Sequence, residues 1–341
     1  MMPSNDHYVI IGNGPAGNHA ADTLRANDGE ARITILSQES VLYYYKHKLT
    51  EYIKGKTGEK ELTVRPSHVY KDKRIRLRLG QEVERIDPLE NRLYLKHMEV
   101  MSYTKLIIAS GASPRILPSV SNFGKYLALL SSYTDVLNQL PEIRKNKRFL
   151  VLGGDLISFK FIRMLKDMGK EVDCLLYADA FWPFNLTPEM ADAASESLRK
   201  SGVRVLSEDG LKTVKQTDQG LDVMTEKGHG AIYDSIYAFL GMMPNISFVL
   251  GSGIDTDRGI LVDDHLKTNF DNVYAAGDCA QIYNTDIKSY WLSVGWKNAS
   301  VQGEVAAMNF LGAGHVINPS PKKILNVEGF TVDTSWWEAF E

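Results

Sequence analysis

An apolar strand, a glycine-rich turn and a helix follow one another near the start of the chain, and this order restricts the fold more than any other feature. Residues 8–11 form the apolar run, and Gly12, Gly14 and Gly17 follow at the spacing G-x-G-x-x-G. The first glycine of such a turn permits a tight bend, the second admits a pyrophosphate, and the third lets the helix pack on the strand. The helix begins with Pro15 and Ala16 and would offer free N–H groups to the phosphates. The turn therefore predicts an α/β fold that binds a dinucleotide.

A second strand and an acidic residue complete this unit. The stretch ARITILSQES at residues 31–40 is suited to a buried strand. Glu39 lies about 20 residues beyond the last glycine, the spacing expected for a carboxylate that binds a ribose. Gln38 is the alternative, because sequence sets the end of a strand only to within a few residues. A purely structural glycine turn is the other interpretation of the whole unit.

Composition and charge argue against several other classes of protein. The 341 residues include 24 % charged residues and carry a net charge of −3, which gives no electrostatic reason to bind nucleic acid or an anionic membrane. We expect neither a signal peptide nor a membrane span, because the sequence shows no basic and apolar leader and no long apolar stretch. Cys174 and Cys279 are the only cysteines, so neither a disulfide framework nor a Cys-x-x-Cys pair is present. These features predict a cytoplasmic protein.

Three further stretches carry a resemblance to a known family. They are YTKLIIASGASPRILP (103–118), TNFDNVYAAGDCAQI (268–282) and GWKNASVQGEVAAMNFLG (295–312). The first two resemble the signatures that follow the glycine turn in FAD-dependent pyridine nucleotide-disulfide oxidoreductases. The third is similar to the flavin-facing helix in the branch that contains NADH:rubredoxin reductases, ferredoxin reductases and the flavin part of NADH-dependent nitrite reductases. The resemblance extends over residues 7–315.

The resemblance implies an α/β architecture with two Rossmann-like three-layer domains. The FAD-binding domain would comprise residues 1–115 and 243–315, and the second, NAD(P)-type domain residues 116–242. Gly and Pro in GASPRILP and GMMPN mark the expected crossings between them. Relatives continue with a third domain, which would be truncated here to a short remnant at residues 316–341. Three aromatic residues of this tail would either fold back on the body or form a patch for a partner subunit: Trp336, Trp337 and Phe340.

The matched motifs also imply how a non-covalent FAD is held. Asp278 follows Gly277 after a buried strand and would accept hydrogen bonds from the ribityl hydroxyls. Helix capping is its alternative role, compatible with the first. Ser110 and Gly111 form a turn at which the backbone would approach the cofactor. Arg115 would reach the pyrophosphate or the adenosine end, or else is a solvated surface residue.

Four further residues are assigned by the same resemblance. Val83 would contact the adenine through its backbone, with a plain core position as the alternative. In LYYYKHKLTEYI (42–53), Lys46 takes the place of the family's arginine and keeps its charge without the bidentate fork. Lys48 would lie near the flavin N5, or in solvent. Trp296 would pack against the isoalloxazine and steer electron exit, with simple packing as the alternative. No cysteine lies near this stretch, so thiol chemistry at the flavin is not expected.

A second strand–turn–helix–strand unit, at residues 149–177, keeps the layout of the first but changes its chemistry. Asp155 stands where a phosphate would approach, and Ser158 stands where the third glycine belongs. Lys160 reverses the charge of the family's glutamate, and Tyr177 replaces a charged ribose-binding residue. A carboxylate in a seat that favours phosphate would repel the nucleotide. We therefore expect a Rossmann unit with a degenerate NAD(P)H site; an altered but working site is the alternative.

These features predict an FAD-dependent oxidoreductase that transfers electrons between its flavin and a redox protein partner, with NAD(P)H as a poor donor. Two alternatives stay open. One is a working NAD(P)H-dependent reductase of the rubredoxin or ferredoxin reductase type. The other is a non-catalytic, flavin-bound scaffold subunit, which would not need Trp296 or the flavin-facing helix. The expected partner is an electron-transfer protein or a partner subunit, and no metal site is predicted.

Overall fold

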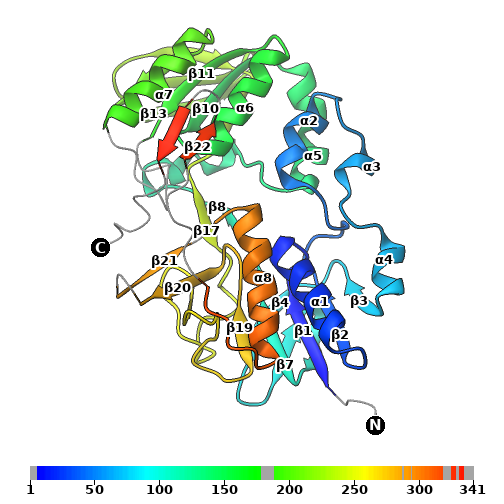
Figure 1. The fold of residues 1–341 in the computed structure, drawn as a ribbon. Coiled ribbons are helices and arrows are strands. Elements are labelled where there is room, and N and C mark those ends of the chain that lie inside the picture. The colour runs from blue at the N-terminus through cyan, green and yellow to red at the C-terminus, as the bar shows by residue number, and fades with distance from the viewer. Residues whose placement is uncertain are drawn as a thin grey trace.

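Two parallel β-sheets, one in each half of the molecule, organise the computed structural model (Figure 1). The structure describes residues 6–177, 188–285, 288–292, 294–317, 324–327 and 330–333. The first sheet has the strand order β19-β7-β1-β2-β3, and every neighbouring pair is parallel. Its strands are β1 (His7–Ile11), β2 (Arg32–Leu36), β3 (Ile75–Arg78), β7 (Lys105–Ile108) and β19 (Val273–Ala275).

Two helices pack on this sheet and on each other, α1 (Pro15–Asn27) and α8 (Trp296–Phe310). All five residues of β1 are buried, as expected of a central strand covered on both faces. Helix α1 turns Ala16, Ala20, Ala21 and Leu24 inward, so its buried face is made mainly of small side chains. This lets α8, which comes from the far end of the chain, lie directly beside α1 (Figure 1).

The second sheet repeats the plan of the first. Its order is β12-β11-β10-β16-β9, again parallel throughout, with β10 in the central place that β1 takes in the first sheet. Helices α5 (Tyr133–Lys145), α6 (Leu156–Asp167) and α7 (Pro188–Lys200) belong to this half (Figure 1). The strands are β9 (Leu127–Ala128), β10 (Arg148–Gly153), β11 (Glu171–Leu176), β12 (Arg204–Ser207) and β16 (Ser235–Ala238). The predicted α/β class with two Rossmann-like units is therefore confirmed.

A short antiparallel pair connects the two halves. Strands β8 (Ala112–Pro114) and β17 (Met242–Pro244) lie between the two sheets in Figure 1, and Met243 pairs with Ser113. These strands lie within the two Gly- and Pro-containing stretches that the sequence marked as crossings.

The remaining elements form smaller sheets and short helices. Antiparallel sheets are built from β4 (Val83–Asp87), β5 (Arg92–Leu95) and β6 (Glu99–Ser102), and from β13 (Leu211–Thr217), β14 (Gly220–Thr225) and β15 (Gly230–Tyr233). A mixed sheet contains β18 (Ile260–Val262), β20 (Ala280–Asn284) and β21 (Ser289–Leu292). The short helices are η1 (Lys46–Lys48), α2 (Leu49–Ile53), α3 (Glu59–Leu62), α4 (Ser67–Asp72), η2 (Lys96–Met98) and η3 (Pro118–Tyr126).

One segment of the first half packs into the core of the second. Leu49, Ile53 and Leu62 are buried among residues of α5, α6 and the second sheet, including Val136 and Phe161. Helix α2 accordingly lies against α5 in Figure 1. The two halves therefore share a hydrophobic core in addition to the β8–β17 connection.

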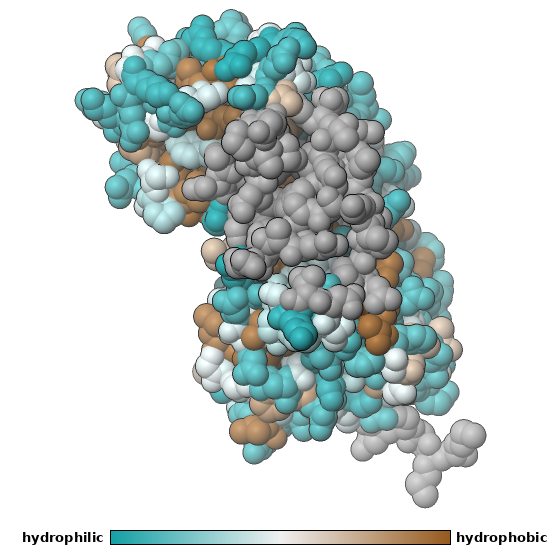
Figure 2. All heavy atoms as spheres, turned by 60° about the vertical axis from the view of Figure 1, so that its left-hand side comes forward, coloured by the Kyte–Doolittle hydropathy of each residue, from teal (hydrophilic) through white to brown (hydrophobic). Residues whose placement is uncertain are grey.

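The described part of the C-terminus is a hairpin, β22 (Ile324–Val327) and β23 (Phe330–Asp333), and β23 contacts α7. The aromatic residues of the expected tail lie outside the described residues: Trp336, Trp337 and Phe340. In the part of the chain that the structure describes, every helix is too short or too polar to cross a membrane. The face in Figure 2 is mostly hydrophilic, with hydrophobic residues lying singly or in small groups among the polar ones.

Candidate functional site

The first glycine turn has two glycines that packing requires and one that faces open space. Gly12 has a φ of 120°, and a Cβ there would lie 1.9 Å from the carbonyl oxygen of Ala109. A Cβ on Gly17 would lie 2.0 Å from the carbonyl oxygen of Gly12. A Cβ on Gly14, by contrast, would meet no described atom within 4 Å. The position at which the motif admits a pyrophosphate is therefore the one left open.

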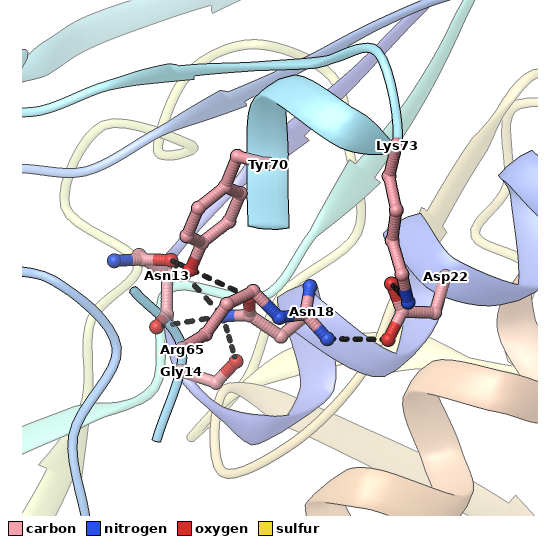
Figure 3. Close-up of polar contacts among 7 residues, drawn as sticks. All are labelled: Asn13, Gly14, Asn18, Asp22, Arg65, Tyr70 and Lys73. Atoms are coloured by element: carbon pink, nitrogen blue, oxygen red, sulfur yellow. Dashed lines mark hydrogen bonds and ion pairs between the residues drawn. The ribbon is translucent and has the colours of Figure 1, made fainter. Parts of the chain in front are cut away.

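A polar network supports this turn from one side (Figure 3). The amide of Asn18 donates from Nδ2 to the carbonyl oxygens of Asn13 and Gly14, at 3.0 Å each. The hydroxyl of Tyr70 donates to the Oδ1 atoms of Asn13 and Asn18, at 3.0 and 2.8 Å. The start of α1 itself carries no side-chain cap among the described residues, so the side chains fix the turn and leave the helix N-terminus available.

An ion-pair cluster extends the network along α1. Asp22 accepts from Nη2 of Arg65 and, at 2.8 Å, from Nζ of Lys73 (Figure 3). The guanidinium of Arg65 lies 5.2 Å from the centre of the Tyr70 ring, and its Nη1 is buried without a hydrogen-bond partner among the described residues. A cationic donor is thus held close to the glycine turn. No local pattern in the sequence predicts this cluster, because Asp22 lies on α1 whereas Arg65 and Lys73 lie more than 40 residues further along the chain.

Asp278 follows β19, and its segment packs against the start of α1. Gly277 has a φ of 81°, and a Cβ there would lie 3.2 Å from Cβ of Ala16, so the two segments approach closely. The Oδ1 atom of Asp278 accepts a hydrogen bond of 3.0 Å from the N–H of Gly295, the residue that precedes α8. Burial raises the pKa of Asp278, and the nearby charge of Lys46 partly offsets this. The carboxylate thus supports α8 from a segment that packs against Ala16 of α1.

The two ribose candidates, Gln38 and Glu39, have different surroundings, and their contact with a ribose stays a prediction. Gln38 is exposed, whereas Glu39 is half-buried and its Oε2 accepts a hydrogen bond of 3.1 Å from the Tyr44 hydroxyl. Burial raises the pKa of Glu39, and the charge of Lys46 opposes the shift. The charge of Lys46 therefore lowers the pKa of both carboxylates, Glu39 and Asp278.

Three other predicted residues take part in the crossing between the halves. The hydroxyl of Ser110 donates to the carbonyl of Asn245 at 2.7 Å, and Gly111 has a φ of 68°. The side chain of Asn245 donates back to the carbonyl of Ser110 at 3.0 Å. Nε of Arg115 donates to the carbonyl of Leu240 at 3.0 Å, so this side chain holds the crossing strands together. Contacts of these residues with a cofactor stay predictions.

Val83 and Lys48 have clear structural surroundings of their own. Val83 is buried in the first core, which is the plain interpretation of this residue. Lys48 is half-buried, and its Nζ lies 4.2 Å from the centre of the Tyr45 ring. Neither placement decides the predicted contacts with adenine and with the flavin N5.

Trp296, the first residue of α8, lies in an aromatic cluster. Its ring stacks on Tyr43 at 5.2 Å with an angle of 7°, and on Tyr45 at 5.5 Å with an angle of 30°. His47 meets it edge-on at 5.4 Å. The indole is therefore held by the segment that carries Lys46, and the charge of Lys46 acts on Asp278.

The second glycine turn differs from the first because its own side chains fill the helix N-terminus. Asp155 caps α6: its Oδ1 accepts a hydrogen bond of 2.6 Å from the N–H of Ser158. The Ser158 hydroxyl donates to the carbonyl of Asp155 at 2.6 Å and accepts from the N–H of Gly154 at 3.1 Å. Burial raises the pKa of Asp155 to about 7, although N–H groups of Ser158, Ile157 and Gly241 stabilise its charged form.

The other two altered positions of this unit surround the turn. Tyr177 is half-buried at the end of β11, where its N–H donates to the carbonyl of Gly153 at 2.8 Å, and Lys160 is exposed on α6. A Cβ on Gly153 would lie 2.6 Å from Cβ of Ser158, so Ser158 occupies the space beside the strand. The sequence predicted that the Asp155 carboxylate lies at this turn, but it did not predict that this carboxylate caps α6.

A match to a known family covers most of the chain. The match is to pyridine nucleotide-disulphide oxidoreductase and spans residues 6–303. The chain belongs to the pyridine nucleotide-disulphide oxidoreductase family. Membership confirms the resemblance drawn from the sequence motifs and the oxidoreductase class.

Individual members of this family share moderate identity with the chain. A nitric oxide reductase FlRd-NAD(+) reductase of Klebsiella pneumoniae subsp. pneumoniae is 29% identical over 280 residues, which are 82% of this chain and 73% of the relative. A rubredoxin-NAD(+) reductase of Pseudomonas putida is 26% identical over 95% of this chain and 85% of its own length. Among solved structures, a chain of a covalent putidaredoxin reductase–putidaredoxin complex superposes with a TM-score of 0.84 and 24% identity, over 94% of this chain and 78% of that one.

Proposed function

We propose that this protein is an FAD-dependent reductase that exchanges electrons with a small redox protein. The observation that carries the proposal is the open space at Gly14, at the uncapped N-terminus of α1. Strand β2, which bonds to this turn through Leu36, leads to Glu39, and the segment that packs against Ala16 carries Asp278. These two carboxylates suit the two hydroxyl-rich parts of a flavin dinucleotide, its ribose and its ribityl chain. The redox protein is suggested by the names of the relatives, which include reductases of rubredoxin and putidaredoxin.

The residues of the chain fit FAD and would divide its binding between them. The first N–H groups of α1 would receive the pyrophosphate at Gly14. Asp278 would accept a ribityl hydroxyl, and Lys46 would balance the charge of the two carboxylates. Trp296, which stacks on Tyr43 and Tyr45, would shield part of the flavin from water. When bound, FAD supplies the electron-accepting group, and these side chains bind, orient and shield it.

The relatives favour a nicotinamide dinucleotide as the second electron carrier. Two of them are named NAD(+) reductases, and the second sheet of this chain repeats the Rossmann plan of the first. A working NAD(P)H-dependent reductase is therefore the first candidate function.

A second candidate is an electron-transfer flavoprotein with a degenerate NAD(P)H site, and Asp155 is the observation that favours it. Its carboxylate takes the N–H of Ser158 that a bound phosphate would use, and Ser158 takes the N–H of Gly154. Repulsion between Asp155 and a phosphate would weaken nucleotide binding by on the order of 1–3 kcal/mol, which is about 5- to 150-fold in affinity.

The proposed division into domains has mixed support. Strand β19, at residues 273–275, completes the first sheet, as expected if residues 243–315 return to the FAD-binding domain. The segment with Leu49, Ile53 and Leu62, however, packs in the second core. We propose that residues 1–115 and 243–315 form one domain and that residues 116–242 form the other. Helices α2 and α3 belong to the first domain and pack against the second.

An anaerobic titration tests the function and separates the two candidates. The purified protein should release FAD, rather than FMN, on acid precipitation. Bleaching of the flavin by micromolar NADH or NADPH would establish the first candidate. Bleaching by a reduced ferredoxin but not by either nucleotide would establish the second, and Asp155→Gly with Ser158→Gly should then restore bleaching by NADH or NADPH. A chain that binds no FAD would overturn both.

A further inference from the structure

The hydroxyl of Tyr44 lies between the two halves of the molecule and is bonded to both. It donates to Oε2 of Glu39 at 3.1 Å, within the first half. It accepts a hydrogen bond of 3.0 Å from the backbone N–H of Tyr133, the first residue of α5. The rings of Tyr44 and Tyr133 also contact each other, with centres 5.8 Å apart. One hydroxyl therefore joins a carboxylate near the glycine turn to a helix of the second half.

Each of the two hydrogen bonds meets a specific need. The N–H groups in the first turn of a helix have no partner within the helix, so the N–H of Tyr133 needs an outside acceptor. The Ser132 side chain, which caps α5, accepts from Asp135 and leaves this N–H to Tyr44. Glu39 is half-buried, and a buried carboxylate without a donor is costly. A phenylalanine at residue 44 would leave both groups unpaired.

We propose that Tyr44 is a positioning residue that orients Glu39 toward the ribose of the bound dinucleotide and links cofactor loading to the docking of α5. The proposal rests on the flavin site proposed above. A ribose that hydrogen-bonds to Glu39 would fix this carboxylate, which fixes the Tyr44 hydroxyl and thus the N–H of Tyr133. The second half of the molecule would then be more firmly held when the cofactor is present.

The charges around Glu39 give the link a pH dependence. Lys46 on η1 lowers the pKa of Glu39, Asp135 on α5 raises it, and the Tyr44 hydrogen bond lowers it. Burial has the largest effect and raises it. Without the Tyr44 hydroxyl the pKa would rise further, so protonation, and with it the loss of a ribose acceptor, would begin at a higher pH.

The test is Tyr44→Phe in the full chain, with Tyr52→Phe as the matched control. Tyr52 accepts a hydrogen bond of 3.2 Å from the Tyr133 hydroxyl, so its variant disturbs the same cluster without touching Glu39. Deflavinated protein is titrated with FAD over a range of pH. Tyr44→Phe should weaken FAD binding about 10- to 100-fold, and the loss of affinity on acidification should begin at a higher pH. Tyr52→Phe should change the affinity for FAD by less than about twofold.

Hydrogen exchange at the Tyr133 amide reports the link directly. FAD should slow this exchange in the parent and in Tyr52→Phe, but not in Tyr44→Phe. Parent-like FAD affinity in Tyr44→Phe, or equal protection of the amide by FAD, would overturn the proposal while leaving the flavin site intact. A parent that binds no FAD would overturn the flavin site and the link together.

Glu39→Gln serves if Tyr44→Phe does not fold. This variant keeps the shape of residue 39 and leaves the Tyr44 hydroxyl bonded to the N–H of Tyr133. It should weaken FAD binding and remove the part of its pH dependence that comes from Glu39, and it should leave the exchange of the Tyr133 amide in the FAD-free protein unchanged. FAD affinity equal to that of the parent would contradict the role assigned to Glu39.

Discussion

Asp155 is a single residue whose charge should be visible in the stability of the protein. Burial raises its pKa from an ordinary carboxyl value to about 7, so the folded state binds the proton more tightly than the unfolded state. The contribution of Asp155 to the free energy of unfolding is therefore most favourable at low pH, and it is lost as the pH rises toward 7. Asp155→Asn keeps a capping side chain without the charge, and should raise the free energy of unfolding at pH 8 by on the order of 3 kcal/mol. Urea denaturation at pH 5 and at pH 8 measures this, and the gain should shrink at pH 5.

Asp234→Asn is the control with the opposite sign. Hydrogen bonds from the N–H groups of Arg148 and Lys147 lower the pKa of Asp234 against the effect of burial. Its charged form thus stabilises the fold above its ordinary pKa, and Asp234→Asn should destabilise the protein at pH 8. The same pH dependence in both variants would argue against the assigned origin of the Asp155 effect.

At the scale of elements, the contact between α1 and α8 depends on Gly303. A Cβ at this residue would lie 2.1 Å from the carbonyl oxygen of Ala16, which is backbone and cannot turn aside. Gly→Ala inside a helix ordinarily stabilises by about 0.5–1 kcal/mol. Gly303→Ala should instead destabilise the protein by about 2 kcal/mol, because it separates the two helices. It should also weaken FAD binding, because it moves the start of α1. Thermal unfolding and FAD titration check this. Gly29→Ala, whose Cβ would meet no described atom within 4 Å, should change stability by less than about 0.5 kcal/mol.

The elements that sequence could predict are those with a local pattern. Gly12, Gly14 and Gly17 carried enough information for the first turn, and the second unit was predicted from its strand–turn–helix–strand layout. The roles of Tyr44 and Gly303 could not be read in this way, because their partners, Tyr133 and Ala16, lie far away in the chain. Asp155 was an intermediate case: its sequence position was informative, but only the folded helix end shows which N–H groups it takes.

At the scale of the whole molecule, Ile53 tests whether the two halves are coupled. It is 1 % exposed and packs in the second core although it belongs to the first half of the chain. Ile53→Ala should destabilise the protein by about 2–4 kcal/mol through the cavity it leaves. Hydrogen exchange should accelerate first in α5 and α6, while β1 and α1 remain protected. Leu89→Ala, at a residue 80 % exposed, is the control and should have little effect. Faster exchange confined to the first sheet would contradict the shared core.

The return of β19 and α8 to the first sheet has a consequence for how the protein is made. Every member of the second core, from Leu49 to Phe239, leaves the ribosome before Asp278 and Trp296 do. At ~5–20 residues per second, the roughly 260 residues between Gly14 and Asp278 take on the order of 10 to 50 s to synthesise. During that interval the inner face of α1 has no helix to pack against, while the second half can already close. Until α8 is made, the first sheet of the new chain would therefore lack β19 and the helix that packs on α1. Binding of the cofactor would then be among the last steps of folding.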